Sequence, residues 1–216
     1  MLNQSEENFI EGDVFRFFYN NDLVKSLSNN MSEKNDAILF FRFFRAGITG
    51  QTLYDESLLK MKELDRIALE HLGCLCELYI FYLRSIYDHL LKFIKKHSKE
   101  DLPRSFNEFL KKVKNDKYVG VSKEFKKMVS GTGFSFEELR NLRDSIKEKF
   151  SVVFPYINEE GKIFIKVEVY GRDKKQKKTI DEELSFFVYR QAMSIWYLTI
   201  LISEEIGLTE KNILKI

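Results

Sequence analysis

The sequence predicts a mainly α-helical protein, a multi-helix bundle with a small β-hairpin inserted before the last long helix. Only two Pro and ten Gly occur in the 216 residues, too few turn residues for a sandwich or barrel of many short strands. Hydrophobic residues make up 44% of the chain, enough to bury a core. Long stretches carry apolar residues at steps of three or four, as amphipathic helices do. We expect a single domain over residues 1–216.

The N-terminal quarter is predicted to form two helices. Apolar residues recur with helical spacing over residues 5–28 and 34–46. The stretch "AGITGQT" interrupts this spacing through Gly47 and Gly50, so a loop is expected there.

The longest helix is expected from about Thr52 to His97, because one apolar stripe recurs there at helical spacing. Pro103 marks the start of a shorter helix. Ser135 and Glu138 form a capping box for another. The shorter helices expected in this region span about 104–114, 122–129 and 136–149.

The hydrophobic period then changes from helical to alternating. The stretches "SVVFPYI" and "KIFIKVEVY" flank "NEEG" and predict a β-hairpin at about 151–170. Pro155 places its first strand at an edge. Thr179 and Glu182 match a capping box for the last long helix, about 180–206.

Positive charge is concentrated in two segments, although the formal net charge is only +2. Residues 92–127 carry twelve Lys or Arg against five acids. The stretch "GRDKKQKK", residues 171–178, carries five against one. These segments are either solvated surfaces or phosphate-binding surfaces. The candidate phosphate-binding lysines in the second segment are Lys174, Lys175, Lys177 and Lys178.

Several classes of protein are not supported by the sequence. The start, "MLNQSEENFI", has no signal-peptide pattern, and "MSIWYLTILI" is about half a membrane span. We therefore expect a cytoplasmic protein with no membrane partner. Cys74 and Cys76 are interpreted as reduced core thiols. No metal site is predicted, because the Cys-x-Cys pair has no second Cys pair and paired Glu-x-x-His motifs on facing helices are lacking. No cofactor is predicted either.

Three histidines, His71, His89 and His97, are candidates for a group that titrates near neutral pH. His97 is expected at an exposed helix end, and His71 would lie about 27 Å from His89 along a helix. His89 falls within the apolar stripe, five residues after Arg84, and Arg84 can pair with Asp88 at i+4. Arg84 and His89 are therefore either a catalytic pair or a salt-bridging Arg and a buried His.

The stretch "RSIYDH", residues 84–89, resembles the Arg-x4–6-His signature of HEPN domains. These are all-helical dimers found in bacterial toxin–antitoxin, abortive-infection and CRISPR-linked ribonucleases. The resemblance covers about residues 53–150 and the final helix. It implies a homodimer that cleaves RNA without metal, with His89 acting on the 2′-hydroxyl and leaving-group protons. Arg84 would hold the scissile phosphate, because its planar guanidinium matches phosphate oxygens.

A second segment matches the usual position of this motif, at the opening of a later helix. In "FEELRNLRDSIKEKF", Arg140-Asn141 and Arg143-Asp144 look like the family's Arg-polar pairs. No His follows them, so this copy is predicted to be non-catalytic and to contribute to binding.

The sequence leaves three functions open. The favoured one is a HEPN-like module that binds RNA, nucleotide or a protein partner in bacterial defence or a toxin–antitoxin system, weakly catalytic or not catalytic. The second is an active metal-independent endoribonuclease that uses Arg84 and His89. The third is an interaction scaffold with no role in nucleic-acid binding.

Overall fold

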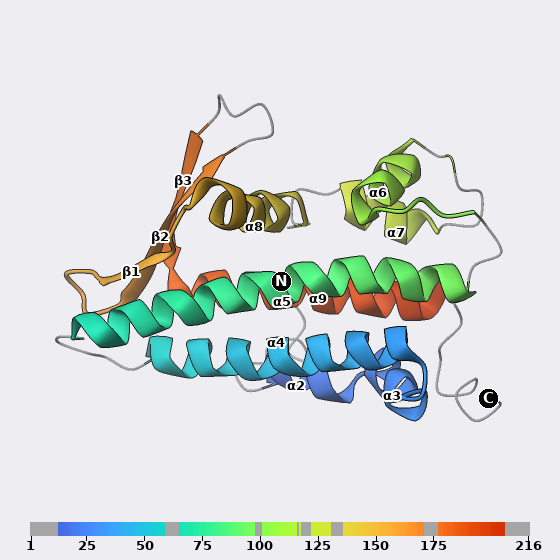
Figure 1. Cartoon of the computed structure of the whole chain (residues 1–216), viewed down its shortest axis with the longest axis horizontal. Coiled ribbons are helices and arrows are strands. Elements are labelled where there is room, and N and C mark those ends of the chain that lie inside the picture. Colours follow the sequence, from blue (N-terminus) through green and yellow to red (C-terminus); the bar gives the residue numbers. More distant parts are fainter. Residues whose placement is uncertain are drawn as a thin grey trace, which may run out of the picture. The chain divides into compact units, whose positions relative to one another are not determined.

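A computed structural model of the chain describes residues 13–58, 65–97, 101–115, 117, 122–130, 136–170 and 177–205. These residues are mainly helical, and a small three-stranded antiparallel sheet precedes the last helix (Figure 1). The chain divides into two compact units. The first comprises residues 1–44, 85–134 and 193–216, and the second comprises 45–84 and 135–192. The helices that contribute residues to both units are α4 (Lys34–Leu58), α5 (Arg66–His97) and α9 (Leu184–Glu205).

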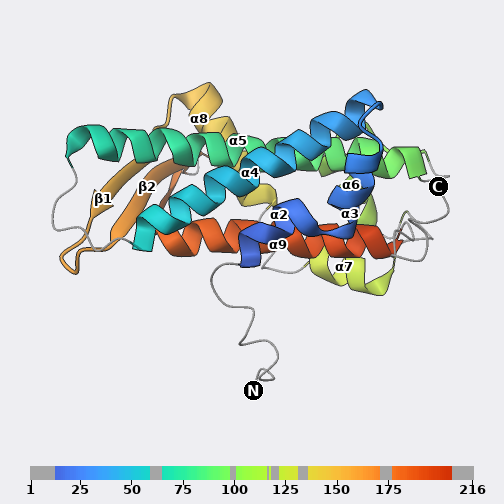
Figure 2. The same ribbon diagram turned by 90° about the horizontal axis from the view of Figure 1, so that it is seen from below.

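The first unit is held together by aromatic side chains. Figure 2 shows α2 alongside the second half of α9, and the rings of Phe17 and Trp196 join these helices, with centroids 6.5 Å apart. The Phe109 and Phe125 rings, 6.1 Å apart, join two short helices of the same unit. The helices that lie wholly in this unit are α2 (Asp13–Asn20), α3 (Asp22–Asn29), α6 (Phe106–Lys114) and α7 (Lys123–Ser130).

The helix expected over residues 5–28 is divided in the structure. Residues 5–12 lie outside the described part, and Asn21 separates α2 from α3. The Asn21 side chain accepts a hydrogen bond from the backbone N–H of Val24 and acts as the N-cap of α3. An Asn that bonds the backbone in this way starts a new helix, and the periodicity alone did not reveal it.

The prediction of a loop at Gly47 and Gly50 is wrong, because α4 continues through both glycines to Leu58. A Gly inside a helix costs only about 1 kcal/mol relative to Ala. The side chains of Ala46 and Leu53, on either side of the glycines, are fully buried. Their burial favours the helix by more than the glycines oppose it.

The longest helix begins later than the sequence predicted. Residues 59–64 lie outside the described part, and α5 starts at Arg66 rather than near Thr52. Asp65 acts as its N-cap, since its carboxylate accepts a hydrogen bond of 2.7 Å from the backbone N–H of Ala68.

The second unit contains the sheet, with strand order β1-β2-β3. Alternate residues of the central strand, from Ile163 to Val169, are buried, and the residues between them face outward. Helix α8 packs against this strand, and Ser145 Oγ accepts a 2.9 Å hydrogen bond from the backbone N–H of Tyr170. The elements are β1 (Phe154–Ile157), β2 (Ile163–Tyr170), β3 (Lys177–Glu183) and α8 (Phe136–Lys149).

The predicted hairpin is confirmed as β1 and β2. The Asn158 side chain accepts hydrogen bonds from the backbone N–H groups of Glu160 and Lys162, which fixes the turn. Gly161 adopts a φ of 80° in this turn, a conformation that glycine takes without steric cost. Pro155 lies in an edge strand, as predicted.

The third strand was not predicted. The prediction that Thr179 and Glu182 form a capping box for the last long helix is wrong. Both residues belong to β3, which pairs antiparallel with β2, and α9 begins only at Leu184. Ile180 is the one buried residue of this strand. A strand with a single buried position carries almost no alternating signal, so the spacing of Thr and Glu was misleading.

The predicted shorter helices are confirmed, and α8 has the expected bounds. Ser105 serves as the N-cap of α6, two residues after Pro103. Ser135 lies outside the described residues, so the capping box that it would form with Glu138 is not described. Within the described ranges, none of the helices has the length and hydrophobicity needed to cross a membrane.

Candidate functional site

Arg84 lies in α5 within the second unit and is almost completely buried, with 8% of its surface exposed. The carbon at the centre of its guanidinium lies 5.0 Å from the centroid of the Phe136 ring. This is a cation–π contact, and it ties α5 to the first residue of α8 within that unit. Arg84 therefore has a structural role that is independent of any ligand.

His89 lies in the first unit and is partly buried. Its Nδ1 is 2.9 Å from the backbone carbonyl oxygen of Ser85. A carbonyl oxygen only accepts hydrogen bonds, so Nδ1 carries the proton and Nε2 is left as the acceptor in the neutral ring.

The environment of His89 keeps the ring neutral. Burial lowers its pKa below 6.5, and the positive charges of Lys92 and Arg42 lower it further. The backbone hydrogen bond at Ser85 and the Asp88 carboxylate act in the opposite direction but do not outweigh these effects. A neutral imidazole with a free Nε2 lone pair has the form that a general base requires.

The α8 residues singled out from the sequence form pairs with their immediate neighbours. Arg140 is buried, and its Nη2 lies 3.1 Å from the Asn141 side-chain oxygen and 3.5 Å from Glu137. Arg143 and Asp144 form a partly exposed ion pair at 3.1 Å. Arg140 is therefore part of the helix packing, and Arg143 is the more accessible of the two cations.

The lysines of "GRDKKQKK" are described only in part. Lys174 and Lys175 lie outside the described residues. Lys177 and Lys178 begin β3 and are both exposed, and Lys177 forms an ion pair with Glu168 on the neighbouring strand.

A larger group of exposed lysines lies on α6 and α7 in the first unit. The apolar sides of these helices meet through Phe109 and Phe125, so the lysine side chains face solvent. Glu108 is the one acidic side chain that the structure describes on the two helices. We call these exposed side chains, together with one lysine just after α6, the lysine face: Lys111, Lys114, Lys117, Lys123 and Lys127.

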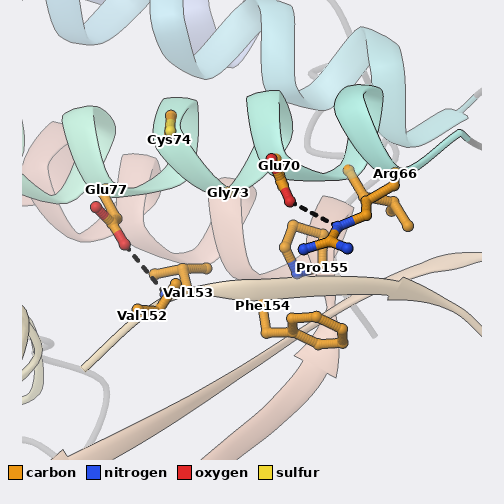
Figure 3. A pocket seen from close by; sticks show the side chains of 10 residues that line it. Arg66, Glu70, Gly73, Cys74, Glu77, Val152, Val153, Phe154 and Pro155 are labelled. Atoms are coloured by element: carbon orange, nitrogen blue, oxygen red, sulfur yellow. Dashed lines mark hydrogen bonds and ion pairs between the residues drawn. The ribbon is translucent and has the colours of Figure 1, made fainter. Parts of the chain in front are cut away.

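An open groove in the second unit was not foreseen from the sequence (Figure 3). One wall is the first half of α5, and the other is the segment 152–155 that enters β1. Its volume is about 670 Å³, within the usual range for ligand sites. Cys74 lines it and is exposed, which corrects its interpretation as a core thiol. Cys76 is buried, and burial raises the pKa of its thiol.

Glu138 is the centre of a polar cluster that joins α8 to α9. Its Oε1 accepts hydrogen bonds from Arg190 Nη1 at 2.7 Å and from Gln191 Nε2 at 3.0 Å. Arg190 also contacts Glu182 at 2.6 Å, and burial raises the pKa of the Glu182 carboxyl. The sequence assigned Glu138 to a helix cap, so these long-range partners were missed.

No group of His, Cys, Asp or Glu side chains in the described part of the chain has an arrangement suited to a metal ion. Comparison with known proteins gives no further guidance, because no protein-family model, curated protein or solved structure matches this chain.

Proposed function

We propose that this protein is a HEPN-like helical module that binds RNA without cleaving it. The observation that carries the proposal is the lysine face of α6 and α7. Residues 101–130 contain eight Lys or Arg and four acids, and five of the lysines are exposed. Neutralising phosphates with such side chains releases counterions, which is the main source of sequence-independent affinity for nucleic acid.

Two features of the described residues support binding rather than catalysis. Arg84, which would hold the scissile phosphate in an active HEPN nuclease, is buried against Phe136. The Arg-polar pairs of α8 are followed by no His. The packing of the helices as one bundle, the homodimer and the role in bacterial defence or a toxin–antitoxin system belong to the same proposal, through the HEPN resemblance. The cytoplasmic location expected from the sequence is proposed with them.

RNA binding is tested by fluorescence anisotropy with a labelled single-stranded RNA of mixed sequence. Replacing Lys111, Lys114, Lys123 and Lys127 together with Gln removes four charges and keeps helix propensity nearly constant. We expect the affinity to fall about tenfold or more at about 50 mM salt. An unchanged affinity would contradict the proposal.

The matched control removes four exposed charges from other surfaces. The control variant carries Gln at Lys25, Lys34, Lys147 and Lys166, all of which are exposed. It has the same net charge as the first variant, so a purely global electrostatic effect would weaken RNA binding equally in both. We expect the control to bind RNA within about twofold of the unmodified protein, because its four charges lie on other elements and salt screens exposed charges that do not contact the phosphates.

The active endoribonuclease remains a second candidate because His89 is held in the neutral form suited to a general base. Such an enzyme cleaves RNA in EDTA and leaves 2′,3′-cyclic phosphate ends. His89→Gln then abolishes cleavage but leaves RNA affinity unchanged. Absence of cleavage by the unmodified protein in EDTA removes this candidate and leaves the binding module.

A further inference from the structure

The groove of the second unit exists because a strand segment passes very close to α5. A Cβ atom added to Gly73 would lie 2.7 Å from the backbone oxygen of Val153 and 3.3 Å from the Pro155 ring. Only glycine permits this approach without displacement. On the same edge, Glu77 Oε1 accepts a 3.2 Å hydrogen bond from the Val153 N–H (Figure 3).

These contacts determine how the groove can recognise a ligand. The N–H of Val153 is used by Glu77, its carbonyl faces Gly73, and Pro155 has no N–H. This part of the strand edge therefore cannot add another strand by backbone pairing. Val152 and Phe154 are left 67% and 61% exposed, so recognition must depend on side chains.

The side chains that line the groove carry a net negative charge. Glu70 and Glu77 lie seven residues apart on α5, two turns or about 10.5 Å, and Arg66 is the one cation among the residues that line the groove. Arg66 and Glu70 form an ion pair at 2.9 Å with side chains 91% and 65% exposed. So exposed a pair contributes at most about 1 kcal/mol, and a ligand cation can replace Arg66.

From this geometry we infer that the groove binds an extended segment of a partner protein, in which two apolar side chains stand between two basic residues. The wall from Arg66 to Glu77 is about 16 Å long, which an extended peptide covers with about five residues. In a polyproline II conformation, which has three residues per turn and rises about 3.1 Å per residue, basic residues three positions apart lie on the same face. They are then separated by about 9 Å and match the two carboxylates. The apolar side chains contact Val152 and Phe154.

This inference goes beyond the proposed RNA binding and concerns a separate surface. RNA phosphates are repelled by Glu70 and Glu77, whereas Lys or Arg side chains of a peptide are attracted. The lysine face has the opposite charge and belongs to the first unit. Loss of RNA binding at the lysine face should therefore leave peptide binding in the groove intact, and the reverse also holds.

The probe is a labelled octapeptide with Lys-Leu-Phe-Lys at its centre, measured by fluorescence anisotropy against the full chain. Two comparison peptides carry Glu-Leu-Phe-Glu and Lys-Ser-Ser-Lys in its place. We expect the first peptide to bind about tenfold or more tightly than either comparison, because it alone satisfies both the charge and the apolar contacts. Equal binding of all three peptides, or no binding of the first, overturns the inference.

Substitutions in the groove locate the binding. Phe154→Ser is expected to weaken the Lys-Leu-Phe-Lys peptide about five- to tenfold. Phe150→Ser is the matched control, since this ring is 88% exposed and does not line the groove. Glu70→Gln and Glu77→Gln are each expected to weaken binding about two- to fivefold and to reduce its salt dependence. Equal effects of Phe154→Ser and Phe150→Ser contradict the site.

Two further readouts exclude other occupants of the groove. Sedimentation of the chain alone tests a second copy: a dimer that dissociates on Phe154→Ser would assign the groove to self-association and overturn the inference. RNA affinity that falls on Phe154→Ser would assign the groove to nucleic acid and overturn it as well. We expect neither the sedimentation coefficient nor the RNA affinity to change.

Discussion

The Glu77 carboxylate and the backbone N–H of Val153 form a hydrogen bond of 3.2 Å that joins α5 to the segment entering β1. The two residues are 76 positions apart in the chain, so this bond is a tertiary contact that local sequence does not determine. It satisfies a backbone donor just before the edge strand β1 and fixes one wall of the groove.

Substitutions at Glu77 should separate its hydrogen bond from its charge. Glu77→Gln keeps a side-chain oxygen that accepts from Val153, so we expect less than about 0.5 kcal/mol of destabilisation. Glu77→Ala removes the acceptor and should lower the free energy of unfolding by about 1–2 kcal/mol. Urea unfolding of both variants measures the difference, and equal losses would show that this bond does not stabilise the fold.

Gly73→Ala should destabilise the protein by about 1–3 kcal/mol, because its Cβ would press against a backbone oxygen. The direction of the change in stability distinguishes a close approach of the two segments from an ordinary helix position. At an unconstrained helix position the same substitution stabilises by up to about 1 kcal/mol. Thermal or urea unfolding that shows stabilisation would mean that the segment 153–155 does not approach α5 closely.

Arg84 and Phe136 should be energetically coupled. A double-mutant cycle with Arg84→Met and Phe136→Leu is expected to give a coupling energy of about 0.5–2 kcal/mol in unfolding experiments. Arg143→Met provides the matched control, since Arg143 is paired with Asp144 rather than with the ring. Coupling that is no larger for Arg84 than for Arg143 would remove the structural role assigned to Arg84.

The pKa of His89 predicts how stability depends on pH. Its pKa in the folded protein is lowered from 6.5, chiefly by burial, so the unfolded chain binds a proton first as the pH falls. The folded state therefore loses stability as the pH decreases from about 6.5 to the folded pKa. The pKa of His97 is lowered too, again chiefly by burial, and adds to the same trend.

Urea unfolding at about pH 7.5 and about pH 5 measures this loss. His89→Gln removes a titrating group and should make stability less dependent on pH, while an NMR titration follows the imidazole directly. A His89 pKa above 6.5, or an unchanged pH dependence in the variant, would contradict the assignment.

Local patterns predicted much of the fold. The Ser-x-x-Glu spacing at Ser135 and Glu138 predicted α8 with its bounds. The alternation of β2 was sufficient to predict that strand, because one of its faces is buried. The third strand was missed because its pairing with β2, rather than its own sequence, stabilises it. The helix through Gly47 and Gly50 was missed because burial of the neighbouring side chains outweighs propensity.

The lysine face and the groove likewise differ in how far the sequence alone could predict them. The lysines of α6 and α7 are adjacent in sequence, so their local charge excess was visible before the structure. The groove brings Gly73 and Glu77 to Val153, and no local pattern encodes that contact. Gly73 inside a predicted helix was the one available signal, since a helical glycine often marks a close approach.

The most direct test of RNA binding by the lysine face is the salt dependence of the affinity. Each phosphate neutralised on single-stranded RNA contributes about −0.7 to the slope of log K against log salt concentration. Replacing Lys111, Lys114, Lys123 and Lys127 with Gln should therefore reduce the steepness by up to about 2.8 between about 50 and about 200 mM salt. The same slope in this variant, in the control variant and in the unmodified protein would contradict the account.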